Sequence, residues 1–136
     1  MKTVPFTLIT PTAVAYEGDA ELVIVVGTEG EEGILASHAP FLTALRPGVL
    51  RANVVEGGAS KRLELATGEG FMQALPERVT VLVDEAVSRE QVDPAAVRAE
   101  LDAALERLKG LASQTPEYER ARAAADFAGA KLTLAG

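Results

Sequence analysis

The side chains that most often carry catalysis or bind metals are scarce in this sequence. His38 is the one histidine, cysteine is absent, and no serine stands in the context of a nucleophile elbow. Without a second histidine or a thiolate, neither a charge-relay triad nor an ordinary zinc site can be assembled. We therefore expect no catalytic residue and no metal site. His38 should instead lie in an interface, or make a local hydrogen bond that holds the turn before Pro40.

Three glutamates and two glycine-rich stretches are the other groups that could bind a ligand. Glu29, Glu31 and Glu32 could offer oxygen ligands to a hard cation, but the ligand spacing of a calcium loop is absent. The glycines at residues 27–30 and 68–70 lack the lysine and the following helix of a phosphate loop. We interpret the glutamates as exposed loop carboxylates or as a protein contact, and the glycines as turns.

The composition limits the class of protein. The 136 residues are 48% hydrophobic and 24% charged, as expected for one ordinary domain or a domain with a small appendage. The net charge of −7, without a visible cluster of lysine and arginine, argues against nucleic acid as a partner. No segment has the pattern of a signal peptide or approaches the ~18 apolar residues of a membrane-spanning helix, so we expect a soluble, unsecreted protein.

Residues 1–88 alternate apolar and polar side chains with a period of two, which is typical of β-strands. The pattern is clearest at residues 62–65 and 78–84, and Gly57-Gly58 between two such runs predicts a tight hairpin. Residues 23–26 are all apolar, so we expect that strand to be covered on both faces. Further strands are predicted at residues 5–10, 14–17, 21–27, 33–36, 41–45, 49–56 and 70–75. Short strands at this density indicate a β-sandwich or flattened barrel.

The period changes after about Ser88, and the rest of the chain is predicted to form two helices in an antiparallel hairpin. Asp93 and Thr115 each precede a proline, the pattern of an N-cap followed by proline at the first helical position. The first helix carries a leucine-rich stripe and the second an alanine-rich one: Val97, Leu101, Leu105 (or Ala104), Leu108 and Leu111, facing Tyr118, Ala121, Ala125 and Ala128 (or Ala124). Because alanine buries little area, and because Gly129 and residues 132–134 weaken the helix, we expect the second helix to be loosely held.

Several segments of the sequence resemble the epsilon subunit of bacterial and chloroplast F-type ATP synthases. Residues 30–48 (GEEGILASHAPFLTALRPG) are similar to the signature of that family. The likeness continues at residues 66–71 (ATGEGF), at 79–82 (VTVL), and at Val92-Asp93 with Arg98-Ala99. The resemblance covers essentially the whole chain. It implies a flattened β-sandwich of about ten strands (1–88) followed by a C-terminal helix-turn-helix (89–136).

The resemblance also implies a non-catalytic subunit of the central stalk, which is part of the rotor. Its partners would be the gamma subunit, the membrane rotor ring (c-ring) and, through the hairpin, the alpha/beta catalytic head. The family segment that lies against gamma is matched by Ser37, His38, Ala39 and Pro40. The loop that faces the rotor ring is matched by Glu29, Glu31 and Glu32. The protein would be a peripheral subunit at the cytoplasmic side of a bacterial cell membrane.

In the family the hairpin either folds onto the sandwich or extends into the catalytic head, where it blocks rotation in the hydrolytic direction. We expect Arg120 and Arg122 to meet acidic residues of the catalytic subunits in the extended form. Some members also bind ATP as a regulatory ligand, through a motif in which an arginine follows an aspartate after two residues. Here four residues separate Asp93 from Arg98, which puts the arginine at a different helical azimuth and argues against nucleotide binding. No cofactor is expected.

Two other classes of protein compete with a stalk subunit. A carbohydrate- or small-ligand-binding β-sandwich with a helical dimerisation tail would need exposed aromatic residues, but aromatics make up 4% of the chain and tryptophan is absent. A small hydrolase would need the missing triad. Co-purification separates these classes, because a stalk subunit should be recovered with gamma and a ligand-binding module should be recovered alone.

Overall fold

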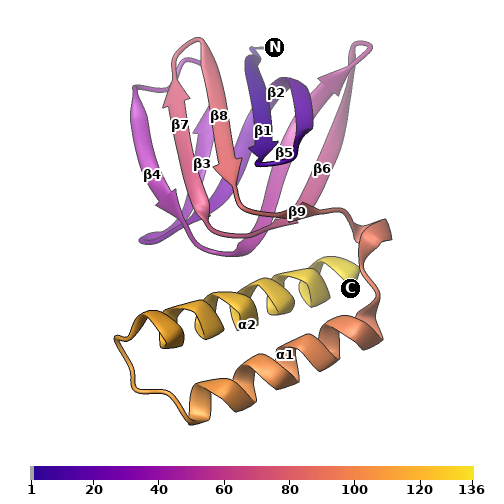
Figure 1. The fold of residues 1–136 in the computed structure, drawn as a ribbon. Coiled ribbons are helices and arrows are strands. Elements are labelled where there is room, and N and C mark those ends of the chain that lie inside the picture. The colour runs from indigo at the N-terminus through magenta and orange to yellow at the C-terminus, as the bar shows by residue number, and fades with distance from the viewer. Residues whose placement is uncertain (1) are drawn as a thin grey trace.

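The computed structural model describes residues 2–136, in which a β-sheet comes first along the chain and two helices follow (Figure 1). The nine strands of this part are β1 (Val4–Thr10), β2 (Ala13–Gly27), β3 (Gly30–Leu35), β4 (Phe41–Leu45), β5 (Gly48–Glu56), β6 (Ala59–Thr67), β7 (Gly70–Leu75), β8 (Arg78–Val83) and β9 (Ala86–Val87). A short 3-10 helix, η1 (Arg89–Gln91), then leads to α1 (Pro94–Lys109) and α2 (Pro116–Ala135). The predicted fold class is confirmed, with nine strands described where about ten are expected.

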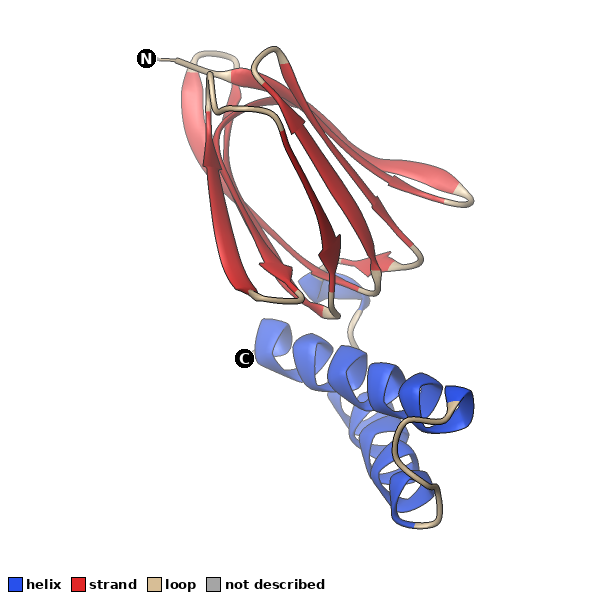
Figure 2. Cartoon of the chain, turned by 90° about the vertical axis from the view of Figure 1, so that its left-hand side faces the viewer, coloured by secondary structure: helices blue, strands red, loops and turns tan. Residues whose placement is uncertain are grey.

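The strands form one sheet that folds back on itself into a flattened sandwich. Their order in the sheet is β1-β8-β7-β4-β2-β5-β6-β9, and β3 pairs with β2. β1 pairs with β8 in parallel and with β2 in antiparallel orientation, so the first strand joins both sides of the sandwich. Figure 2 shows the strands in two layers, with the helices lying across one end of them. The broad faces of the sandwich are therefore left without a helical cover.

The space between the two layers is filled by the aliphatic side chains that the alternating pattern points inward. Phe6, Leu8, Val23, Ile34 and Met72 are each no more than 1% exposed. The fully buried residues of this core all come from strands β1 to β8, and none comes from the helices. Because hydrophobic stabilisation scales with the apolar area removed from water, the sandwich has a source of stability that does not depend on the hairpin.

Strand β2 differs from the prediction in length. The sequence predicts two strands, at residues 14–17 and 21–27, but β2 is continuous over 15 residues. Its first half pairs with β1 and its second half with β3, and an irregularity in its pairing with β5 falls between Ala20 and Leu22. The strand thus changes partners without ending, which local sequence patterns do not report. Of residues 23–26, Val23 and Val25 are buried but Ile24 and Val26 are half-buried, so the second face is only partly covered.

Both helices begin at the predicted caps. The carboxylate of Asp93 accepts hydrogen bonds from the backbone N–H groups of Ala95 and Ala96, and the hydroxyl of Thr115 accepts one from the N–H of Tyr118. These bonds satisfy donors that the first turn of a helix leaves without a partner. The predicted antiparallel hairpin is confirmed.

The helix α2 extends further toward the C-terminus than its sequence predicts. The helix runs through Gly129 and through residues 132–134 and ends at Ala135. Ala130 and Leu134 are 7% and 3% exposed, and they pack against the sandwich. Residues 132–134 are therefore helical despite their low helix propensity, because tertiary packing outweighs it.

Helix α2 lies between the sandwich and α1 (Figure 1). It packs on β5, β6 and η1 on one side and on α1 on the other. On α1, Val97 and Ala104 are buried whereas Leu105 is 45% exposed, so Ala104 rather than Leu105 continues the inner stripe. The helix nearest to the linker in sequence is thus the one farther from the sheet.

Candidate functional site

The turn that joins β3 to β4 contains the segment Ser37–Pro40. Ser37 adopts a φ of 66°, in the left-handed region that side chains other than glycine rarely occupy. The ring Nδ1 of His38 donates a hydrogen bond to the carbonyl oxygen of Ala39 across 2.7 Å, and the ring lies edge-on to Phe41 with 6.2 Å between centroids. The local bond predicted for His38 is present, and it fixes the shape of a turn whose other side chains are exposed.

A row of apolar side chains crosses the outer face of the sheet that β4 helps to form. Strand pairing aligns Val14 with Ile9, Ile9 with Leu82, Leu82 with Phe71, and Phe71 with Ala44. We call these five residues, together with Leu42 two positions from Ala44 on β4, the apolar row. Val14, Phe71, Leu82 and Leu42 are 58%, 56%, 49% and 68% exposed. The row ends at Leu42, two positions after Pro40, so it comes close to the Ser37–Pro40 turn along the chain.

The three glutamates lie at the opposite end of β3 from that turn. Glu29 is in the turn after β2, whereas Glu31 and Glu32 are on β3 itself rather than in a loop. The Glu31 carboxylate accepts a hydrogen bond from the guanidinium of Arg51 on β5, across 2.6 Å. Only Glu29 is therefore a loop carboxylate in this structure, and Glu31 is already paired.

A groove of about 740 Å³ separates this end of the sandwich from α2. Its sandwich side is lined by Glu31, Arg51 and Glu64, and its helix side by Arg122 and Asp126. Arg122 lies 4.0 Å from Asp126, one turn further along α2. The charges in the groove are thus largely matched in pairs, and α2 meets the sandwich through a polar rim.

Beneath that rim, a second and smaller apolar cluster attaches the hairpin to the sandwich. Phe127, Ala130 and Leu134 of α2 pack on Ala66 of β6, with Val49, Val87 and Val92 around them. This cluster is distinct from the sandwich core. Phe127, Ala130 and Leu134 recur at three- and four-residue steps, so a second stripe on this helix was visible in the sequence beside the alanine stripe. It was missed because the alanines already accounted for one packed face.

Arg120 and Arg122 are both exposed, and each lines a different cavity between α2 and the sandwich. Arg120 is 3.8 Å from Glu117 on its own helix and lines a small cavity with Glu69, Asp84 and Glu85 of the sandwich. The folded hairpin therefore holds these arginines beside acidic groups of the same chain.

Asp93 and Arg98 are not brought together as ligands. Asp93 is occupied in capping α1, and Arg98 is exposed on that helix. Neither residue lines the groove between α2 and the sandwich, so Asp93 and Arg98 are not part of it.

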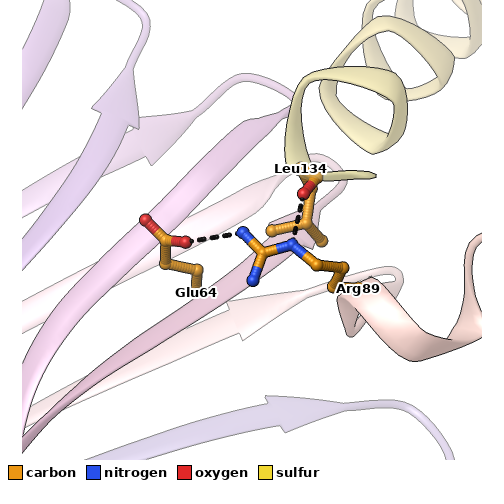
Figure 3. Close-up of polar contacts among 3 residues, drawn as sticks. All are labelled: Glu64, Arg89 and Leu134. Carbon is orange, nitrogen blue, oxygen red and sulfur yellow. Dashed lines mark hydrogen bonds and ion pairs between the residues drawn. The ribbon is translucent and has the colours of Figure 1, made fainter. Parts of the chain in front are cut away.

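Arg89 is a further charged residue at the hairpin contact, and no signal in the sequence singles it out. It lies in η1, where the chain leaves the sandwich. Its Nε donates a hydrogen bond to the carbonyl oxygen of Leu134 across 2.7 Å, and its terminal nitrogen donates one to the Glu64 carboxylate across 3.0 Å (Figure 3). One guanidinium thereby joins the linker, strand β6 and the last turn of α2.

Within residues 2–136, no helix is both long and apolar enough to cross a membrane. The same residues contain no group of three His, Asp or Glu side chains placed to hold a metal ion.

Comparisons with known proteins identify the family. Residues 3–89 match the family model for the β-sandwich domain of the ATP synthase delta/epsilon chain. The ATP synthase epsilon chain of Magnetococcus marinus is 40% identical over 130 residues, which cover 96% of this chain and 92% of that relative. The epsilon chain of Shouchella clausii is 37% identical over 135 residues, covering 99% and 96%.

Solved structures share the fold. A chain of the Euglena gracilis mitochondrial ATP synthase, solved with its OSCP, F1 and c-ring parts, superposes with a TM-score of 0.77 at 22% identity, covering 96% of this chain and 79% of that one. A chain of the Tetrahymena thermophila mitochondrial ATP synthase central stalk and c-ring gives a TM-score of 0.59 at 17% identity, covering 98% and 93%. The shared fold agrees with the sequence matches, which have the higher identity. This chain belongs to the ATP synthase epsilon chain family and is a non-catalytic subunit of that complex.

Proposed function

We propose that this chain is a central-stalk subunit whose sandwich binds the gamma subunit and faces the rotor ring, and whose hairpin regulates ATP hydrolysis by changing its position. The observation that carries the proposal is the separation of the two apolar clusters. The sandwich has its own core, and the hairpin is attached through a smaller patch around Phe127 and Leu134. A module attached in this way can be released while the sandwich keeps its fold and its partner.

The apolar row is the surface proposed for gamma. Monomeric proteins rarely expose several large apolar side chains side by side, and such patches mark interaction sites. Phe71 and Leu82 form a cross-strand pair at the middle of the row, and each is about half exposed. The row ends at Leu42, two positions after Ser37–Pro40, the segment that resembles a gamma contact, and we include that turn in the proposed surface. The hairpin lies across the end of the sandwich and leaves this face uncovered (Figure 1).

Co-purification with gamma tests this surface. The double variant Phe71→Ser, Leu82→Ser should bind gamma at least about tenfold more weakly, because central apolar side chains carry most of the energy of an interface. Leu105→Ser is the matched control, since Leu105 is a similarly exposed leucine on α1. Equal gamma binding by the double variant and the control would show that the row is not the gamma surface.

For the hairpin we propose that Arg120 and Arg122 leave the acidic groups of this chain and meet acidic residues of the alpha/beta catalytic head. Their side chains are more than half exposed, so they can exchange partners at little cost. Deleting residues 89–136 should raise ATP hydrolysis by the assembled complex without loss of gamma binding. Unchanged hydrolysis in a complex that still retains the truncated chain would remove the regulatory role.

The same proposal assigns Glu29, Glu31 and Glu32 to the end that faces the rotor ring, on the cytoplasmic side of a bacterial membrane. It needs no cofactor. Nucleotide binding through Asp93 and Arg98 is not included, because Asp93 caps α1 and neither residue lines the groove between α2 and the sandwich. Calorimetric titration of the full chain with ATP checks this point, and saturable heat would require a nucleotide site to be added.

A further inference from the structure

Arg89 lies where the linker, the sandwich and the end of the hairpin meet (Figure 3). Two different edges of its guanidinium are in use, Nε toward the Leu134 carbonyl at 2.7 Å and a terminal nitrogen toward Glu64 at 3.0 Å. The guanidinium is planar and its donors have fixed directions, so both bonds form together only when α2 has one particular position on the sandwich.

The dipole of α2 also favours the contact between Arg89 and the Leu134 carbonyl. The last four carbonyl groups of a helix have no partner within the helix, and they carry the negative end of the helix dipole. A cation that hydrogen-bonds one of these carbonyls both satisfies it and stabilises the end of the helix. α2 has no basic residue in its own last turn. Arg89, 45 positions earlier in the chain, supplies that cation instead.

The two bonds differ in what would happen if the hairpin moved. Glu64 is on β6 and stays with the sandwich, whereas Leu134 leaves with α2. Arg89 lies in η1, next to β9, which pairs with β6. When α2 departs, Arg89 can therefore keep its bond to Glu64 and remain oriented for the return of the helix.

We propose that the Arg89 side chain fixes the position in which the folded hairpin lies on the sandwich, and that Glu64 keeps its guanidinium oriented. We call the two hydrogen bonds of Arg89 the latch. This inference rests on the proposed function, because it requires a hairpin that changes position. The apolar cluster around Phe127 supplies attraction without direction. The latch supplies direction: it fixes which turn of α2 lies next to the linker. Arg89 is thus a positioning residue, and it acts through the helix that it holds.

Distance measurement in the full-length chain tests the latch. The chain has no cysteine, so Glu77→Cys and Ser113→Cys place two unique labels, one on the turn between β7 and β8 and one between the helices. Spin-label or fluorescence distances then report the fractions of folded and released hairpin. Arg89→Ala should shift that ratio about three- to tenfold toward release, the effect of losing two partly solvated hydrogen bonds.

Three further variants separate positioning from general destabilisation. Glu64→Gln should shift the ratio less than Arg89→Ala, and it should have little further effect in the Arg89→Ala background. Arg89→Lys should restore part of the folded fraction, because an ammonium can bond one of the two partners. Arg62→Ala, which removes a different arginine, on β6, should leave the ratio unchanged.

An unchanged ratio in Arg89→Ala, or an equal shift in Arg62→Ala, would overturn the latch. The outcome for the proposed function is read separately, from ATP hydrolysis by the assembled complex. If Arg89→Ala releases the hairpin but hydrolysis does not change, the latch stands and the regulatory role fails. If the ratio does not change in Arg89→Ala but truncation still stimulates hydrolysis, the regulatory role stands and the latch fails.

Discussion

Lys131 on α2 forms an ion pair with Glu100 on α1 across 2.8 Å, and this pair ties the two helices of the hairpin together. The Lys131 side chain is only 15% exposed, although it carries a charge. Its ammonium group also lies 4.7 Å from the centre of the Phe127 ring, in a cation–π contact. A single lysine therefore connects α1 to the residue that anchors α2 on the sandwich.

Replacing this lysine should loosen the hairpin. Lys131→Met keeps most of the apolar stem but removes the charge, and we expect a loss of about 1 kcal/mol from the two charged contacts. Hydrogen exchange of the α1 and α2 amides measures the change. Lys109→Met is the control, because Lys109 is 74% exposed and pairs with Glu106 on the same helix. Equal effects of the two substitutions would contradict a special role for Lys131.

Removing the anchor should separate the hairpin from the sandwich. Phe127 is 7% exposed in the second apolar cluster, and truncating such a phenylalanine costs about 3 kcal/mol. In Phe127→Ala we expect faster hydrogen exchange in α2 and easier proteolysis around η1, with no change for the amides of β1, β7 and β8. Destabilisation of the sandwich core by the same amount would show that the two clusters form one cooperative unit.

A substitution at Gly129 should stabilise the hairpin instead of loosening it. It lies inside α2, and a Cβ added there would meet no atom within 4 Å. Alanine is favoured over glycine in a helix interior by about 1 kcal/mol, so Gly129→Ala should stabilise α2. The helical circular dichroism signal should persist to higher urea concentration. Gly70→Ala is the contrasting case, because its Cβ would fall on the carbonyl oxygen of Leu82 and should destabilise the sandwich.

Tyr16 should make the stability of the sandwich depend on alkaline pH. Its hydroxyl donates a hydrogen bond to the Glu56 carboxylate across 3.2 Å. Burial, then this hydrogen bond, then the negative charges of Glu56 and Asp19 raise the pKa of Tyr16 above 10.0. The folded state thus holds the proton more tightly, so this contribution is complete below pH 10.0 and is lost as the pH rises through the raised pKa.

In Tyr16→Phe that alkaline loss should disappear. The free energy of unfolding, measured by urea titration at a series of pH values, should fall less steeply above pH 10.0 than in the parent chain. Parallel curves for the two proteins would mean that Tyr16 has the same pKa in the folded and unfolded states.

The elements that could be predicted from the sequence are those with a strong local signal. The caps at Asp93 and Thr115 and the alternation at residues 78–84 each act within a few residues, and the structure has all of them. The exposed positions of Phe71 and Leu82 are only weakly indicated by the sequence. Val81, Leu82 and Val83 are apolar in succession, which requires one of them to point outward, but the partner on β7 is set by strand pairing.

What the sequence could not provide depends on contacts between distant segments. The pairing of β9 with β6, the bonds of Arg89 and the packing of Leu134 each join residues that are far apart in the chain. Local propensity at residues 132–134 even pointed the wrong way, because the burial that stabilises this turn comes from the sandwich. The proposed contacts of Ser37–Pro40, Glu29, Arg120 and Arg122 involve other chains and remain predictions.

The turn between the helices and the contact with the sandwich lie at different places along α2. Leu134 is in the last turn, beside the linker, and Phe127 is near the middle of the helix, while residues 110–115 form the far tip, about 30 Å from Leu134 along the helix. Changes in the length of this turn would alter how far the hairpin extends in the proposed released form, but they would leave the packing of Phe127 and Leu134 on the sandwich unchanged. The length of the hairpin and its contact with the sandwich can therefore vary independently among related chains.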